Sequence, residues 1–161
     1  MRVGATNARQ MKKIRIYLVD DEPVVLRGLQ LLLGRQPGMV IVGSSDSVAS
    51  ALVEAPGLHP DIVVLDLTLK DGDGFRMISE FRVSCPRARL LVFSMHAEPA
   101  FIEAAIQAGA NDYVIKAEGT EKLLQALDRL IASHSHDVKG LIPSVLPTAA
   151  NPEATPPRPS K

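Results

Sequence analysis

The stretch DIVVLDL, residues 61–67, contains the features that decide the fold. Its Ile-Val-Val-Leu core, residues 62–65, is an unbroken apolar run, which is typical of a strand buried on both faces of a parallel sheet. Asp66 follows this run directly. A carboxylate in that position is out of place in a core, so we interpret the run as a rigid mount that ends where the chain enters a crevice.

Apolar runs and amphipathic segments alternate on either side of this stretch. We expect parallel strands at residues 14–19, 39–43, 61–67, 89–94 and 112–116. A helix is expected after each strand: from Pro23 to Gly34, from a Ser47 cap to Pro56-Gly57, along Phe75, Ile78 and Phe81, up to Gly109, and from a Thr120 cap onward. Five consecutive βα units of this kind predict an α/β fold with helices on both faces of a parallel sheet.

Composition limits the classes of function. The chain has 161 residues, of which 46% are hydrophobic, and its 18 basic and 18 acidic residues cancel. A neutral chain gives no electrostatic reason to expect direct nucleic-acid binding. The single cysteine, Cys85, excludes an internal disulfide, suits a cytoplasmic setting and is interpreted as a packing residue. We find no signal peptide and no run long enough to span a membrane.

The ends of the chain differ from its middle. We predict a disordered leader over residues 1–11 and one folded domain over residues 12–134. Residues 135–161 are rich in proline, alanine, serine and threonine, which predicts a disordered tail.

Polar residues stand at the expected carboxyl ends of four strands: Asp20 and Asp21, Asp66, Ser94, and Lys116. In a parallel α/β sheet these ends meet at one edge, where ligands bind. Three carboxylates repel one another unless a hard cation joins them, and ligands that are all oxygen favour Mg²⁺. A lysine and a hydroxyl beside such a cluster suit phosphate. We therefore interpret Asp66, central and exposed at the end of its strand, as a nucleophile that accepts a phosphoryl group.

Each of these residues, considered alone, could have a purely structural role. A single aspartate at a strand end is more often a helix cap or a turn former, and a lone lysine is a solvated charge. Their convergence at four strand ends favours a functional site.

The segment DGDGF, residues 71–75, is not a calcium loop, because Phe75 takes a ligand position and Arg76 stands where the loop requires glycine. An aspartyl phosphatase needs a second acid where Thr68 stands.

The chain resembles the receiver domains of two-component response regulators from about Lys12 to His134. The resemblance rests on LVDDEP, VVLDLTLKDGDG, FSMH and AGANDYVIKAE, and on the spacings that separate Asp66, Ser94 and Lys116. These spacings are similar to those in receivers of helix-turn-helix transcriptional regulators. The resemblance implies a doubly wound, flavodoxin-like (βα)5 fold with strand order 2-1-3-4-5.

The resemblance also implies a role for each matching residue. Asp66 matches the phosphoacceptor, and Asp20 and Asp21 match the acidic pair that holds Mg²⁺. Thr68 matches the residue whose backbone carbonyl completes the metal site. Lys116 matches the lysine that pairs with the phosphate, Ser94 the switch hydroxyl that moves onto it, and Tyr113 the aromatic that then swings inward.

Four residues depart from the family pattern. Lys70 and Ala117 stand where many receivers have proline, the second of these in a cis peptide. Met95 is larger than the usual small residue after the switch serine, which predicts narrower access to the phosphate. His96 replaces an acid or amide, which predicts altered dephosphorylation. None of the four removes a required group.

We therefore expect a phosphorylation-dependent signalling switch whose only chemistry is phosphoryl transfer to its own Asp66 and hydrolysis from it. The expected partners are a histidine kinase or a phosphotransfer protein, and downstream a protein partner or a second copy of the chain. The residues after His134 are too few and too rich in proline for a DNA-binding domain. Two alternatives stay open: the receiver fragment of a truncated transcriptional regulator, and a small phosphatase on the same fold.

Overall fold

A computed structural model of the chain describes residues 12–139. Strands and helices alternate, and a short 3-10 helix, Lys116–Glu118, joins the last strand to the last helix. The elements are β1 (Ile14–Val19), α1 (Pro23–Gly34), β2 (Met39–Ser45), α2 (Val48–Leu58), β3 (Ile62–Leu65), α3 (Gly74–Ser84), β4 (Arg89–Ser94), α4 (Pro99–Ala108), β5 (Asp112–Ile115) and α5 (Thr120–Lys139). All neighbouring strands are parallel, in the order β2-β1-β3-β4-β5. The predicted doubly wound topology is confirmed.

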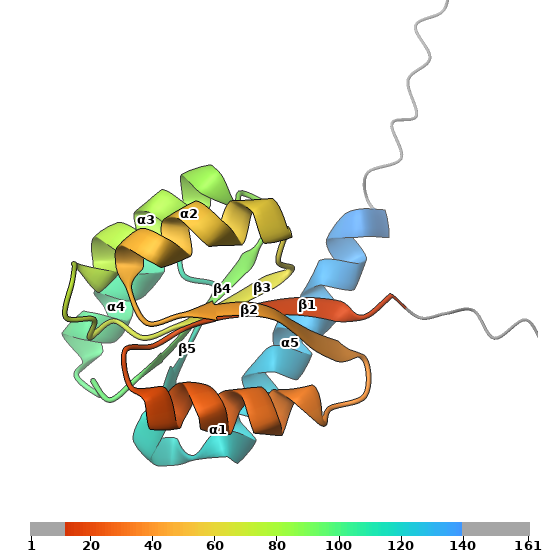
Figure 1. Cartoon of the computed structure of the whole chain (residues 1–161), viewed down its shortest axis with the longest axis horizontal. Coiled ribbons are helices and arrows are strands. Elements are labelled where there is room, and N and C mark those ends of the chain that lie inside the picture. The colour runs from red at the N-terminus through yellow and green to blue at the C-terminus, as the bar shows by residue number, and fades with distance from the viewer. Residues whose placement is uncertain (1–11, 140–161) are drawn as a thin grey trace, which may run out of the picture.

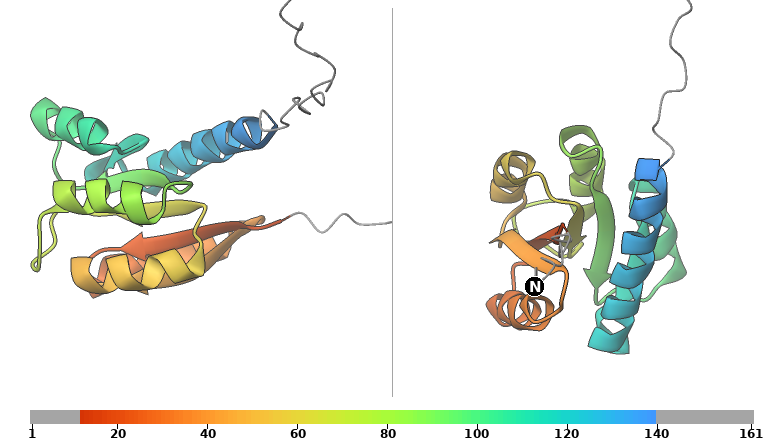
Figure 2. Two further views of the ribbon diagram at one scale, coloured as in Figure 1. Left: turned by 90° about the horizontal axis from the view of Figure 1, so that it is seen from above. Right: turned by 90° about the vertical axis from the view of Figure 1, so that its right-hand side faces the viewer.

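Two apolar cores lie on opposite faces of this sheet. One includes side chains of α2, α3 and α4, and the other includes side chains of α1 and α5. Figure 1 shows α2 and α3 above the sheet and α1 below it, and the turned views in Figure 2 show the same layers. Every residue of β3 is buried because the strand is central and covered on both faces. The apolar run at residues 62–65 therefore has the predicted position.

Four elements have boundaries that differ from the sequence prediction. β2 continues to Ser45, β3 covers only Ile62–Leu65 of the predicted 61–67, and β5 ends at Ile115, one residue early. α5, for which no end was predicted, reaches Lys139. α2 does not stop at Pro56 but ends at Leu58, followed by His59 in the left-handed conformation with φ 47°. Packing overrides the proline, since the buried residues of α2, Ala51 and Ala55, hold the helix against the sheet.

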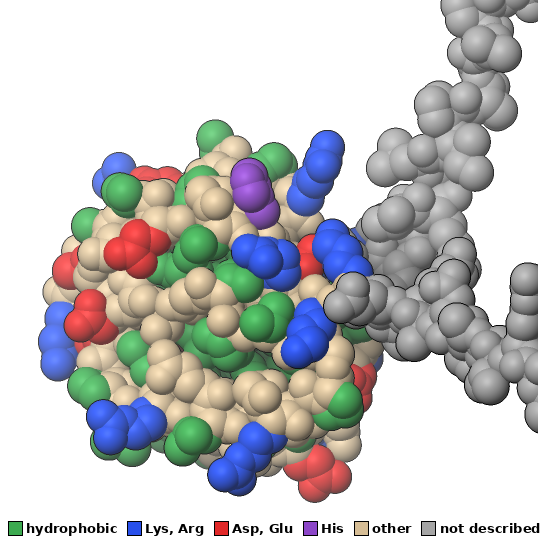
Figure 3. Space-filling view, turned by 45° about the vertical axis from the view of Figure 1, so that its right-hand side comes forward, with side chains coloured by type: hydrophobic (Ala, Val, Ile, Leu, Met, Phe, Trp, Pro, Cys, Tyr) green, Lys and Arg blue, Asp and Glu red, His purple; other side chains and the backbone are tan. Residues whose placement is uncertain are grey.

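Basic and acidic side chains both occur on the face shown in Figure 3, as the balanced composition suggests. None of the helices in the described part of the chain has the length and hydropathy to span a membrane. Cys85 is buried at the end of α3, in agreement with a packing role. The predicted leader over 1–11, and the tail beyond 139, lie outside the described residues.

Candidate functional site

The carboxyl ends of β1 and β3 bring two buried carboxylates together. The two strands pair directly, with Val19 opposite Leu65, and the amide of Asp66 donates a hydrogen bond of 2.9 Å to the carbonyl of Val19. Asp20 and Asp66, the residues that follow, therefore lie beside each other at the centre of the sheet edge. Both side chains are only 3% exposed. Two anions this well buried need a cation.

Lys116 supplies that cation. It follows β5 directly, and its ammonium lies 2.7 Å from Asp20 Oδ2, 2.9 Å from Asp66 Oδ2 and 3.2 Å from Glu22 Oε1. Burial by itself lowers the pKa of a lysine, but here the hydrogen bonds and charges of Asp20 and Asp66 outweigh burial and raise the pKa of Lys116. The lysine is therefore a fixed positive charge at the centre of the site.

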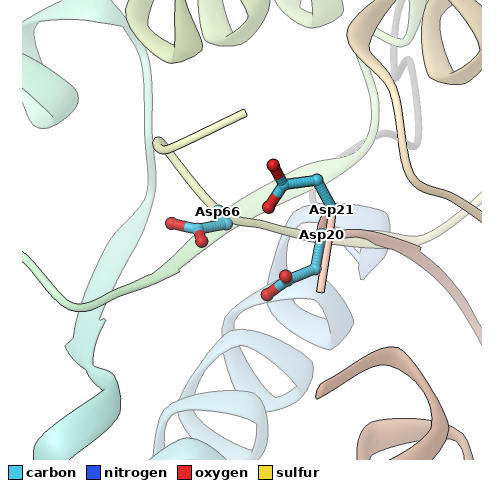
Figure 4. Close-up of side chains that lie close together, drawn as sticks. All are labelled: Asp20, Asp21 and Asp66. Carbon is cyan, nitrogen blue, oxygen red and sulfur yellow. The ribbon is translucent and has the colours of Figure 1, made fainter. Parts of the chain in front are cut away.

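Asp21 adds a third carboxylate to Asp20 and Asp66. One oxygen from each of the three lies within 4.8 Å of the others, and Figure 4 shows the three side chains turned toward the same region. Burial raises the pKa of Asp20, the charge of Asp66 adds to this effect, and Lys116 opposes it. Closely spaced oxygen ligands with excess negative charge are the donor set that Mg²⁺ prefers. The residues present thus fit a magnesium ion.

The burial of Asp66 differs from the sequence interpretation, which placed this residue in an exposed position. The whole residue is only 3% exposed. Lys116 lies against one carboxylate oxygen, Oδ2, and the amide of Thr68 donates a hydrogen bond of 3.2 Å to the other, Oδ1. Both oxygens are therefore partnered, and the side chain is held in one orientation.

Ser94 and Tyr113 form a second group of contacts beside this cluster. Ser94 is completely buried at the end of β4, and its Oγ accepts a hydrogen bond of 3.5 Å from the amide of His96. The hydroxyl of Tyr113 donates a hydrogen bond of 2.8 Å to the carbonyl of His96. Burial raises the pKa of Tyr113, a hydrogen bond from Ser94 opposes this, and the charge of Asp66 adds to it. The tyrosine is thus within electrostatic reach of Asp66.

Three residues near the site are exposed: Thr68, Glu22 and Met95. Thr68 is exposed, two residues after Asp66. Glu22 is 59% exposed at its side chain and was not singled out from the sequence as a site residue, although it follows the acidic pair directly. Met95 is 62% exposed. Within the described residues every peptide bond is trans, including the bond between Lys116 and Ala117.

The comparisons with known proteins agree with this geometry. The family model described as the response regulator receiver domain matches residues 16–128 of the chain. The chain belongs to the response regulator receiver family. This receiver is 39% identical over 103 residues to the DNA-binding transcriptional activator DevR/DosR of Mycobacterium tuberculosis, covering 64% of this chain and 48% of that protein.

The receiver is also similar to a curated nitrate/nitrite regulator and to a solved LuxR-family structure. The nitrate/nitrite response regulator NarL of Escherichia coli is 29% identical over 117 residues, which cover 73% of the receiver and 54% of NarL. The crystal structure of a LuxR-family two-component response regulator from Aurantimonas sp. SI85-9A1 superposes with a TM-score of 0.71 at 37% identity, covering 75% of the receiver and 86% of that chain. The receiver spans about half the length of these two curated relatives.

Proposed function

We propose that this receiver is a phosphorylation-dependent switch of a cytoplasmic two-component system. The observation that carries the proposal is the Lys116 ammonium held between the buried carboxylates of Asp20 and Asp66. A carboxylate oxygen of Asp66 attacks the phosphorus of a phosphohistidine on a kinase or a phosphotransfer protein. The P–N bond breaks, its electrons pass to the imidazole, which takes up a proton, and an acyl phosphate forms on Asp66.

The surrounding residues stabilise the charge that accompanies this transfer. Asp20, Asp21 and the backbone carbonyl of Thr68 would hold Mg²⁺, with Asp66 as a further ligand. When bound, the ion neutralises the negative charge that the phosphoryl group brings to the cluster. Lys116 then pairs with a phosphoryl oxygen, since its ammonium already lies 2.9 Å from Asp66 Oδ2.

The conformational response begins at Ser94 and Tyr113. The Ser94 hydroxyl donates a hydrogen bond to the new phosphoryl group, which changes its contacts with Tyr113 and His96. Tyr113 passes the change to the face formed by α4, β5 and α5, where a downstream protein or a second copy of the chain binds. This is a local electrostatic event that biases a two-state element.

A second candidate for the output is the control of transcription. The names of the relatives favour it, because DevR/DosR is a DNA-binding transcriptional activator about twice as long as the matched region. In that case this receiver regulates a DNA-binding unit. The longer open reading frame, with a DNA-binding assay on its product before and after phosphorylation, distinguishes this output from one that works through protein contacts alone.

Phosphorylation itself is tested with a small donor. The chain is incubated with Mg²⁺ and acetyl phosphate and followed by intact-mass spectrometry. We expect one phosphate per chain in the wild type and none in Asp66→Asn. Asp128→Asn, which removes an exposed carboxylate on α5, is the matched control and should be labelled like the wild type. Labelling that persists in Asp66→Asn would overturn the assignment, and continuing turnover of the donor would favour a phosphatase.

A further inference from the structure

A carboxylate in the loop between β3 and α3 binds the first turn of helix α2. Asp71 Oδ1 accepts a hydrogen bond of 3.0 Å from the amide of Val48, and its Oδ2 accepts one of 3.3 Å from the amide of Ala49. Val48 and Ala49 are the first two residues of α2, and Val48 lies 23 positions before Asp71 in the chain. The contact therefore joins two elements that the sequence does not connect directly.

Asp71 supplies half of the capping at this helix end. The first four amides of a helix have no partner within the helix. In α2 the third, from Ser50, is bound by the Ser47 side chain at 3.2 Å, and the fourth, from Ala51, by the Ser47 carbonyl at 3.1 Å. The hydrogen bonds of Asp71 are exposed, so water can satisfy the first two amides without it. Capping alone does not account for a carboxylate delivered from another element.

The same carboxylate fixes the middle of the loop that leaves Asp66. Leu69, two positions before it, is buried in the core that contains the inner face of α2. Gly72, just after it, lies so close to α2 that a Cβ there would stand 3.0 Å from Val48 Cγ2. The part of the loop between Asp66 and Asp71 includes Thr68, whose amide donates to Asp66 Oδ1. Fixing Asp71 therefore restricts where the backbone of Thr68 lies.

We propose that Asp71 is a positioning residue of the Asp66 site: its carboxylate, bound to the first two amides of α2, holds the β3–α3 loop so that the carbonyl of Thr68 is in place for Mg²⁺. The inference rests on the proposed function, since it requires Thr68 to be a backbone ligand. Asp71 is not one of the three clustered carboxylates, which are Asp20, Asp21 and Asp66. It acts through the loop alone.

The experiment separates loop positioning from helix capping. Asp71→Ala removes both hydrogen bonds to α2, and Asp71→Asn keeps one acceptor oxygen and tests the same contact with less disturbance. Ser47→Ala is the matched control, because it removes a cap at the same helix end without touching the loop. Mg²⁺ affinity is measured on the full chain by NMR titration of backbone amides. The initial rate of labelling by acetyl phosphate is then measured against Mg²⁺ concentration.

We expect Asp71→Ala to need about tenfold more Mg²⁺ for half-saturation, which is the lower end of the cost of losing a supporting contact at a metal site. Asp71→Asn should lie between Asp71→Ala and the wild type, and the maximal labelling rate at saturating Mg²⁺ should be unchanged. Ser47→Ala should bind Mg²⁺ like the wild type even where urea denaturation shows an equal loss of stability.

Two results would overturn the inference. If Asp71→Ala and Asp71→Asn bind Mg²⁺ as tightly as Ser47→Ala does, Asp71 is a helix cap and nothing more. If the wild type binds Mg²⁺ and is labelled while the two Asp71 variants lose maximal rate but not affinity, the loop does not act through the metal. A wild type that fails to bind Mg²⁺ is a different outcome, because the proposed function then fails and the inference fails with it.

Discussion

The charge balance of the site depends on one side chain. The Lys116 ammonium is 7% exposed and contacts two carboxylates that are each 3% exposed. In Lys116→Met these carboxylates keep their burial and lose their cation, and removal of one partner from a buried ion pair is strongly destabilising. We expect the free energy of unfolding at pH 7 to fall by about 3 kcal/mol. Urea denaturation measures the difference.

The pH dependence of stability tests this electrostatic explanation. Without Lys116 the pKa of Asp20, already raised by burial, rises further. When the pKa of a group is higher in the folded than in the unfolded state, the free energy of unfolding of the protein decreases as pH increases. The deficit of Lys116→Met should therefore shrink as pH falls from 7 toward 5, and added Mg²⁺ should also reduce it. Lys122→Met, which alters an exposed lysine on α5, should change little. A deficit that does not depend on pH or Mg²⁺ would contradict the electrostatic account.

Individual residues also show what the sequence was able to predict about the site. Asp20, Asp66 and Lys116 each follow an apolar run directly, so the parallel topology alone placed them at one edge. The depth of Asp66 was missed, because burial depends on Lys116 and on loops from other elements. The role of Asp71 was missed for a similar reason, since its hydrogen-bond partners lie on α2 and no local pattern connects them.

At the scale of elements, the turn into α3 requires a glycine. A Cβ at Gly74, the first residue of α3, would lie 2.6 Å from the Cα of Leu67 and would also meet the carbonyl oxygen of Leu67. These are backbone atoms that follow Asp66 directly, so they cannot move aside without disturbing the site. We expect Gly74→Ala to lower the free energy of unfolding by about 2 kcal/mol, and to slow labelling of Asp66 by acetyl phosphate.

Gly28 provides the opposite case in the same chain. It lies in the middle of α1, and a Cβ there meets nothing within 4 Å. Gly28→Ala should therefore stabilise the chain by about 1 kcal/mol, the difference in helix propensity between the two residues. Both variants are compared by urea denaturation. If Gly74→Ala were as stable as Gly28→Ala, the close approach of α3 to Leu67 would have no energetic importance.

Element boundaries were predicted well where a local signal exists and poorly where packing decides. Pro23 at the start of α1 and Gly109, with φ 119° after α4, are local signals, and both ends lie where they were predicted. Pro56 is also a local signal, yet α2 continues past it because its buried alanines pack on the sheet. The strand order could not be derived from periodicity, since the pairing of β1 with both β2 and β3 is a long-range property.

At the scale of the whole molecule, a chain of contacts connects the Asp66 edge to two helices. The Tyr113 hydroxyl binds the carbonyl of His96, and the His96 ring stacks on Phe101 of α4 with 4.2 Å between ring centroids. Phe101 in turn lies 5.8 Å from Phe75 of α3. A change at Ser94 therefore has a physical route to α4 and α3.

Ser94→Ala tests whether that route carries a signal. With beryllofluoride as a mimic of the phosphoryl group, we expect backbone amide shifts in the wild type to change from Asp66 through Tyr113 and along α4. In Ser94→Ala the ligand still binds, but the changes should stay near Asp66, because the hydroxyl that links the phosphoryl group to Tyr113 is absent. Ser84→Ala, an exposed hydroxyl at the end of α3, is the matched control and should respond like the wild type. Shifts along α4 that are equal in wild type and Ser94→Ala would show that the response reaches α4 without Ser94, and the two-state element would then lie elsewhere in the fold.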